Sequence, residues 1–194
     1  MKPDDLAFFK SIGVDIDPKL LYCATTDQLV ALTKEKIEKV IDEIERDSKV
    51  YSKLGEDGIS SIIASSLNGS GIFVVKRETN SRGHVDLTIT APMYAPEHVF
   101  RYLGEAKVWS HQQYCIDGFA QLMGYLTGRQ KNAFTIIYFR IQSCDEQFKN
   151  YVKGLLNQKG GSEVMLKPRF GQTLHTHQSG ALVDIDHFAV HLPL

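Results

Sequence analysis

The sequence has few of the features that mark secreted or membrane proteins. It holds three cysteines in 194 residues, Cys23, Cys115 and Cys144, an odd number without a CxxC pair. A disulfide framework and a cysteine zinc site are therefore both disfavoured. No apolar run is long enough to cross a bilayer, and residues 1–5 are acidic where a secretory signal would be basic and then apolar. We therefore expect a cytoplasmic protein.

The sequence also lacks an excess of charge of either sign. Its 22 Lys and Arg residues are balanced by 23 Asp and Glu residues, which gives a net charge of −1 at pH 7. Bulk electrostatic binding of nucleic acid needs many more cations, so any contact with a polyanion must be local. Basic groups near predicted strand ends are the candidates for such a contact. Each of them could equally be solvated surface charge without a binding role. These groups are Lys76 with Arg77 and Arg82, Arg129 with Lys131, and Lys167 with Arg169.

The first quarter of the chain has a helical pattern. Ile37, Val40 and Ile44 recur at steps of three and four residues, which predicts an amphipathic helix over residues 34–53. Thr25 and the two residues after it can cap an earlier helical piece. Since the length suits one domain with an appendage, we assign residues 1–53 to an N-terminal helical extension and 54–194 to the main domain.

The main domain is predicted to be an α/β protein. The apolar patterns after Gly55 predict a fixed order of elements: a helix at 56–67, strands at 72–75, 85–90 and 102–109, a helix at 112–126 and a strand at 134–139. A helix between the last two strands fits a parallel crossover. We therefore expect a mixed central β-sheet flanked by helices. A helix near 146–156 and strands near 163–166 and 181–192 follow, and we do not assign the positions of these strands in the sheet.

Charged residues stand on two of the predicted strands. Asp86 belongs to the strand at 85–90, and Glu105, Ala106 and Lys107 belong to the one at 102–109. Since alternate side chains of a strand share a face, Glu105 and Lys107 point the same way while Ala106 points into the sheet. If the two strands pair, Asp86 and Glu105 converge on a site for a divalent cation. Two other triplets of this type, at 17–19 and 47–49, contain a proline or lie on a charged helix and cannot build such a site.

Asp86 and the Glu105-Ala106-Lys107 triplet resemble the PD-(D/E)XK nuclease superfamily, whose restriction-endonuclease-like core is an αβββαβ unit. The resemblance covers about residues 55–140, with Val85 at a position where proline is common. It implies that Asp86, Glu105 and the carbonyl of Ala106 bind Mg²⁺, for which Mn²⁺ can substitute. It also implies that Lys107 orients or activates the attacking water.

Two further features extend the resemblance. Gln121 and Tyr125 are similar to the QxxxY element of the RecB-like exonuclease branch, and their spacing places them on one helical face. A partly buried helix with an incidental glutamine is the alternative. Glu56 opens the helix on which the superfamily often carries an additional acidic ligand, with Asp57 as its rival. Complementing the helix N-terminus is a sufficient other reason for an acid there.

Several histidines and aromatic residues are weaker candidates. His84 is expected to share the face of Asp86, where it could contact a phosphate, a water or the metal, or be only a polar neighbour. Trp109 and Tyr114, which flank His111, could stack on bases, although the tryptophan fits a core equally well. Structural or surface roles are favoured for the C-terminal histidines, which lack cysteines or a following acid: His175, His177, His187 and His191.

These features lead us to expect a Mg²⁺-dependent deoxyribonuclease, with RNA as an alternative substrate. Metal ions bound by two carboxylates stabilise charge on the attacking and leaving oxygens of a phosphodiester. Since no sequence-reading module is present, we expect restraint by homo-oligomerisation or by docking on a partner protein, as in an anti-phage defence effector. A catalytically silent module of the same fold and a Holliday-junction resolvase are the alternatives. The complete set of site residues disfavours the first, and the near-neutral charge disfavours the second.

Overall fold

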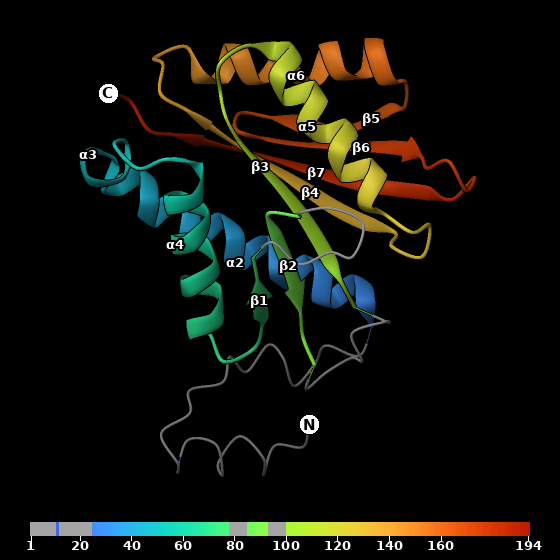
Figure 1. Cartoon of the computed structure of the whole chain (residues 1–194), viewed down its shortest axis with the longest axis horizontal. Coiled ribbons are helices and arrows are strands. Elements are labelled where there is room, and N and C mark those ends of the chain that lie inside the picture. Colours follow the sequence, from blue (N-terminus) through green and yellow to red (C-terminus); the bar gives the residue numbers. More distant parts are fainter. Residues whose placement is uncertain (1–10, 12–24, 78–84, 93–99) are drawn as a thin grey trace.

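A seven-stranded mixed β-sheet forms the centre of the molecule in the computed structural model (Figure 1). Three neighbouring strands in the middle of the sheet run parallel to one another, and the other neighbouring pairs are antiparallel. The structure describes residues 11, 25–77, 85–92 and 100–194. In spatial order the strands are β1 (Val74–Lys76), β2 (Leu87–Thr90), β3 (Tyr102–Val108), β4 (Asn132–Phe139), β7 (Leu182–His191), β6 (Phe170–Thr176) and β5 (Ser162–Lys167).

Helices cover both faces of this sheet. One apolar core lies between the sheet and α2 and α4, and a second core lies between the sheet and α5 and α6. Figure 1 shows α5 and α6 together on one side of the sheet, with α2 crossing on the other. No helix in the described ranges is long and apolar enough to cross a membrane. The helices are α2 (Thr26–Arg46), α3 (Ser48–Tyr51), α4 (Glu56–Gly69), α5 (Gln112–Tyr125) and α6 (Cys144–Lys159).

The helix α2 begins where its sequence caps it. The hydroxyl of Thr25 accepts a hydrogen bond from Gln28 N at 3.3 Å, and the side chain of Gln28 accepts one from Thr25 N at 3.1 Å. This reciprocal cap starts one helix of 21 residues, where the sequence predicted a short piece followed by a helix over 34–53. Its apolar face, including Ile37 and Ile44, packs into the same core as α4 and the sheet. In its described part, the predicted extension therefore shares a core with the main domain.

The order α4, β1, β2, β3, α5, β4 is the order of elements that the sequence predicted. β2 pairs with β3 in antiparallel orientation, and β3 pairs with β4 in parallel orientation, as the intervening helix suggested. The prediction of an α/β protein with a mixed sheet flanked by helices is confirmed. Because β2 and β3 are antiparallel, the start of β2 and the end of β3 lie at the same end of the sheet.

The strand β6 was missed because its buried face is polar. Its buried residues are Gly171, Thr173 and His175, so the usual alternation of apolar and polar residues is absent. β6 joins β7 and β5, and β7 in turn runs parallel to β4. The unassigned strands near 163–166 and 181–192 are thus β5 and β7, which complete the sheet beyond β4.

Candidate active site

The site forms where the ladder between β2 and β3 ends. The ladder ends at the pair of Leu87 with Gly104, so Asp86, directly before β2, lies opposite Glu105. The Oδ2 atom of Asp86 accepts a hydrogen bond from Ala106 N at 2.8 Å. A backbone N–H at a strand edge needs an acceptor, and the carboxylate supplies one where the neighbouring strand no longer does. This bond holds Asp86 beside the triplet.

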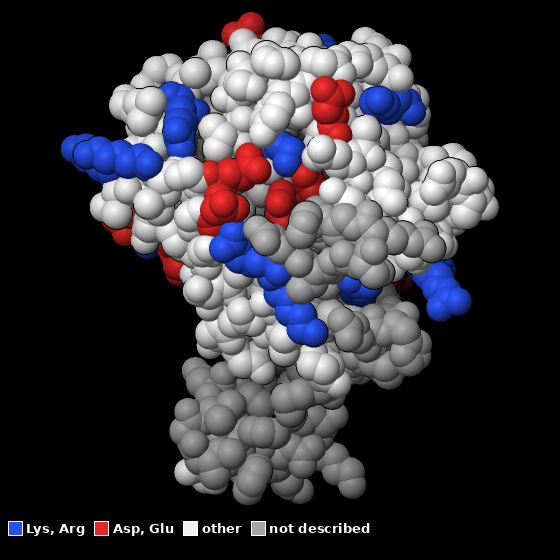
Figure 2. All heavy atoms as spheres, in the orientation of Figure 1, with Lys and Arg blue, Asp and Glu red and all other residues white. Residues whose placement is uncertain are grey.

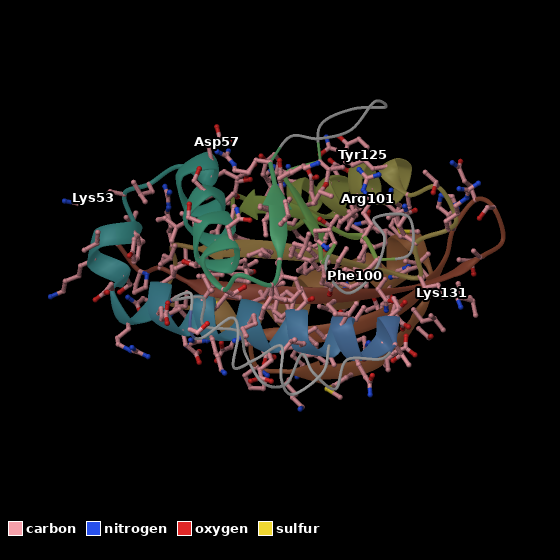
Figure 3. All side chains as sticks on the ribbon, turned by 90° about the horizontal axis from the view of Figure 1, so that it is seen from below. Lys53, Asp57, Phe100, Arg101, Tyr125 and Lys131 are labelled. Atoms are coloured by element: carbon pink, nitrogen blue, oxygen red, sulfur yellow. The ribbon has the colours of Figure 1, made fainter. Side chains whose placement is uncertain are left out.

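A second carboxylate reaches the same edge from α4. Glu56, the first residue of that helix, accepts a hydrogen bond at Oε2 from Val108 N at 2.9 Å. Val108 is two residues beyond Ala106, so the two amides point to the same edge of β3. Asp57 instead pairs with Arg77 at 3.0 Å and is exposed (Figure 3). Of the two acids that the sequence left open, Glu56 is the one that joins Asp86 and the triplet.

The ammonium group of Lys107 lies among three carboxylates. Its Nζ atom is 2.6 Å from Oε1 of Glu105, 3.7 Å from Oε1 of Glu56 and 3.9 Å from Oδ2 of Asp86. We call these four residues the acidic cluster. Figure 2 shows acidic side chains gathered around a basic one on this face of the molecule. The predicted convergence of Asp86, Glu105 and Lys107 is therefore present, with Glu56 added.

Helix α5 forms the other wall of the cluster. A Cβ atom at Gly118 would lie 2.9 Å from both Cγ and Cε of Lys107, so glycine leaves the space that this side chain occupies. One helical turn earlier, the ring centroid of Tyr114 is 5.9 Å from Lys107 Nζ, a cation–π distance. Gly118 was not predicted as a site residue, although a glycine in the middle of a helix usually has a packing reason.

Burial shifts the proton equilibria of the cluster. The Glu105 side chain is only 3% exposed, and burial, reinforced by the charge of Asp86, raises its pKa to about 7. Burial also raises the pKa of Asp86, against the hydrogen bond from Ala106. Burial alone would lower the pKa of Lys107. Its hydrogen bond to Glu105 and the three negative charges outweigh burial, so that the pKa of the lysine is raised and the ammonium stays charged.

The oxygen donors of the cluster fit a hard divalent cation. Oε2 of Glu105 is buried and has no hydrogen-bond partner in the described part of the chain, and such an atom is costly unless a positive group meets it. The carbonyl of Ala106 points to the same edge as its N–H. Among the described residues, however, no three His, Cys, Asp or Glu side chains are grouped closely enough to hold a metal ion as they stand. Lys107 is the cation that the carboxylates now share.

The two residues of the QxxxY element differ in their relation to the cluster. Tyr125 is partly buried, and its pKa is raised by burial and then by the charges of Glu105 and Asp86, which lie near it. The side chain of Gln121, one helical turn earlier, is exposed, and no hydrogen bond joins it to the cluster in the described structure. Tyr125 therefore borders the cluster, and Gln121 faces solvent beside it.

The weaker aromatic candidates have structural contacts. Trp109 stacks on Phe139 with ring centroids 4.9 Å apart, and His111 accepts a hydrogen bond from Tyr114 N as the cap of α5. Tyr114 remains partly exposed at the rim of the cluster. His84 lies outside the described residues.

The C-terminal histidines form no metal group within the described ranges. The ring of His187 is fully buried and bonds to the hydroxyls of Thr135 and Thr173, each at 2.8 Å. Burial lowers the pKa of His187 to about 3 and that of His175 to about 4. Both rings are therefore neutral at physiological pH. His177 bonds to the hydroxyl of Ser179, and His191 bonds to the carbonyl of Ile141.

Comparisons of the chain with protein-family models, curated proteins and solved structures found no match. The resemblance to the PD-(D/E)XK superfamily therefore stays a prediction that rests on the residues described above.

Proposed function

We propose that the protein is a cytoplasmic metal-dependent nuclease of the PD-(D/E)XK superfamily that hydrolyses phosphodiester bonds of DNA. One observation carries this proposal. Oxygens of Glu56, Asp86 and Glu105 come within 3.9 Å of a single ammonium, that of Lys107, at the point where β2 and β3 separate. Carboxylates can bind the metal ions that phosphodiester hydrolysis uses, and a lysine beside them can stabilise the negative charge of the reacting phosphate.

Four groups would hold Mg²⁺ or Mn²⁺: the carboxylates of Glu56, Asp86 and Glu105, and the carbonyl of Ala106. All are oxygen donors, which hard cations prefer. A bound ion would supply Lewis-acid stabilisation of the phosphate and lower the pKa of a water ligand. The partnerless Oε2 of Glu105 is the atom that such an ion would satisfy.

The protein's own side chains have separate tasks in this proposal. The amides of Ala106 and Val108 orient Asp86 and Glu56 through single hydrogen bonds. Lys107 stays charged, with a side chain only 13% exposed, and its charge stabilises the negative phosphate in a site of reduced dielectric. Tyr125 lies beside the cluster, where it could contact the substrate, and Gln121 on the same helical face is exposed to solvent.

The test is incubation of the purified protein with linear, circular and single-stranded DNA and with RNA, in Mg²⁺, Mn²⁺ or EDTA. We expect cleavage with either metal and none in EDTA. Asp86→Asn and Glu105→Gln should lower the rate at least a hundredfold, since each removes a charged metal ligand. Asp57→Asn, on the same helix end as Glu56 but paired with Arg77, is the matched control and should retain the rate. Full activity of either cluster variant would overturn the assignment.

One observation favours a second candidate, a catalytically silent interaction module with the same fold. Lys107 already neutralises part of the acidic charge, and the described residues hold no ready-made metal group. Calorimetry with Mg²⁺ separates the two functions. Saturable binding that is lost in Glu105→Gln supports the nuclease, whereas no binding in the intact protein supports the silent module.

We also propose that the activity is restrained by oligomerisation or by docking on a partner protein, as in an anti-phage defence effector. No sequence-reading module was recognised in the chain, and unrestrained cleavage would damage host DNA. Unrestricted degradation of any plasmid by the isolated monomer would contradict this part of the proposal.

A further inference from the structure

A pocket of about 340 Å³ lies beside the start of α2, β3 and β4. Three of the side chains that line it are cationic, Arg101, Arg129 and Lys131, and Asp27 is its single lining acid. We call this the basic pocket. Figure 3 shows Arg101, Lys131 and Tyr125 in the same half of the molecule, with Lys53 at the opposite end.

The structure distinguishes the basic groups that the sequence could not rank. Arg77 is held by Asp57 and Ser61, and Arg169 is held by Glu45 and Asp145. These two guanidinium groups are committed to contacts within the chain. Arg129 and Lys131 are exposed and form no ion pair within the described residues. Arg129 and Lys131 are therefore the two cations of the basic pocket that remain available to an anion.

One residue of the basic pocket, Arg101, borders the strand that carries Glu105 and Lys107. Arg101 directly precedes β3, and Glu105 lies four residues further on, which corresponds to about 13 Å along an extended strand. By the alternation of the strand, Arg101 is on the side of Glu105, whereas Thr26, Asp27 and Val30 of the pocket belong to α2 on the other side. The pocket therefore lies at the end of the sheet where β3 begins. A strand of nucleic acid whose scissile phosphate lies at the cluster could thus place a neighbouring phosphate in the pocket.

Electrostatics give a reason for a separate phosphate site. The surroundings of the cluster carry Glu56, Asp57, Asp86 and Glu105 against Lys107 and Arg77, so they do not attract a polyanion strongly. With a net charge of −1, the molecule as a whole does not either. Affinity for phosphates must then come from a local group of cations.

We propose that the basic pocket binds a backbone phosphate of a single-stranded substrate, a few nucleotides from the phosphate held at the acidic cluster. This inference rests on the proposed nuclease function and adds the place and the chemistry of substrate binding. A single strand is favoured because one pocket meets one phosphate, whereas a duplex presents phosphates over a broad surface.

The first experiment measures binding without cleavage. A short fluorescent single-stranded DNA is titrated with the full chain in EDTA at several salt concentrations. Arg129→Ala and Lys131→Ala should each weaken binding about tenfold and lower the slope of log affinity against log salt by about 0.7. Lys53→Ala, which removes an exposed lysine at the opposite end, is the matched control and should change neither quantity. Unchanged affinity and slope in both pocket variants would overturn the proposal.

The second experiment uses Mg²⁺ and cleavage. The Arg129→Ala/Lys131→Ala variant should raise the KM for an oligonucleotide and leave kcat unchanged. A dinucleotide, which is too short to reach the pocket, should be cleaved equally by both proteins. Cleavage with no effect of the variant on KM or on the salt slope overturns the phosphate site and leaves the nuclease intact. No cleavage by the unaltered chain, with binding still weakened in the variants, overturns the nuclease and retains the pocket as a nucleic-acid site.

A third arm distinguishes a strand from a free nucleotide. Adenosine monophosphate is added as competitor to the fluorescent DNA. Displacement only at concentrations far above those of an unlabelled oligonucleotide supports a backbone phosphate. Displacement at equal or lower concentrations shows a mononucleotide pocket, and the proposed role in holding a strand is then wrong.

Discussion

The carboxyl of Glu105 is buried with one oxygen bound to Lys107 and the other without a partner in the described structure. Burial disfavours its charged form more than the lysine favours it, so the pKa rises from 4.5 to about 7. A group with a raised pKa near neutrality is typical of functional sites. At the scale of single residues, the raised pKa of Glu105 therefore marks the cluster as a candidate functional site.

The first prediction concerns the pH dependence of stability. Between pH 4.5 and about 7, the folded chain holds a proton on Glu105 that the unfolded chain has lost. The free energy of unfolding therefore decreases by roughly 3 kcal/mol as the pH rises through this window. Glu105→Gln should remove this decrease, as measured by urea unfolding at several pH values in EDTA. Glu163→Gln, at an exposed position of β5, is the control, and a pH profile of Glu105→Gln identical to that of the unaltered chain would contradict the prediction.

At the scale of elements, α5 is shaped to fit the lysine of β3. Gly118 faces Lys107 so closely that a Cβ atom would meet the lysine stem at 2.9 Å. Gly124, on the same helix, has no atom within 4 Å of the corresponding position. Gly118 is therefore required by the packing of α5 against Lys107, whereas Gly124 is not required by any neighbouring side chain.

The second prediction compares these two glycines. Gly118→Ala should displace Lys107 and lower kcat at least tenfold with little change in KM, because the lysine acts on the reacting phosphate. Gly124→Ala should leave kcat unchanged and stabilise the protein by about 0.5–1 kcal/mol through helix propensity. The measurements are steady-state kinetics and urea unfolding. Equal kinetics of the two variants would show that Gly118 does not position Lys107.

At the scale of the whole molecule, α2 is joined to the sheet by an ion pair between a partly exposed lysine and a buried acid. Lys34 Nζ lies 2.8 Å from Oδ1 of Asp186, which is fully buried on β7, and Tyr102 donates a hydrogen bond to the other oxygen at 2.5 Å. Burial raises the pKa of Asp186, and Lys34 opposes this effect. The helix α2 and the strand β7 are therefore parts of one folding unit.

The third prediction tests this connection. Lys34→Ala should destabilise the protein by roughly 3 kcal/mol, since it leaves a buried carboxylate without its counter-ion. Lys39→Ala, on the same helix, breaks an exposed pair with Glu35 and should cost about 0.5 kcal/mol or less. Urea unfolding near neutral pH measures both. Equal losses in the two variants would mean that Asp186 is neutral or otherwise satisfied in the folded protein.

Local patterns in the sequence were sufficient for most elements and for the centre of the cluster. Apolar periodicity depends only on neighbouring residues, and it placed α4, α5 and β2 to β4 within a few residues. The alternation of a strand likewise placed Glu105 and Lys107 on one face. Pairing of the Asp86 strand with the triplet strand was a condition of the prediction, and the ladder between β2 and β3 meets it.

Only the tertiary structure decided the remaining features, because they depend on contacts between distant segments. Glu56 rather than Asp57 joins the cluster because the end of β3 presents the Val108 amide to it. The polar buried face of β6 and the space at Gly118 make sense only beside their partners. The basic pocket likewise assembles from three elements that are separate in the sequence. The sequence by itself thus determined which side chains share a face, and the packing of helices on the sheet decided which of them meet.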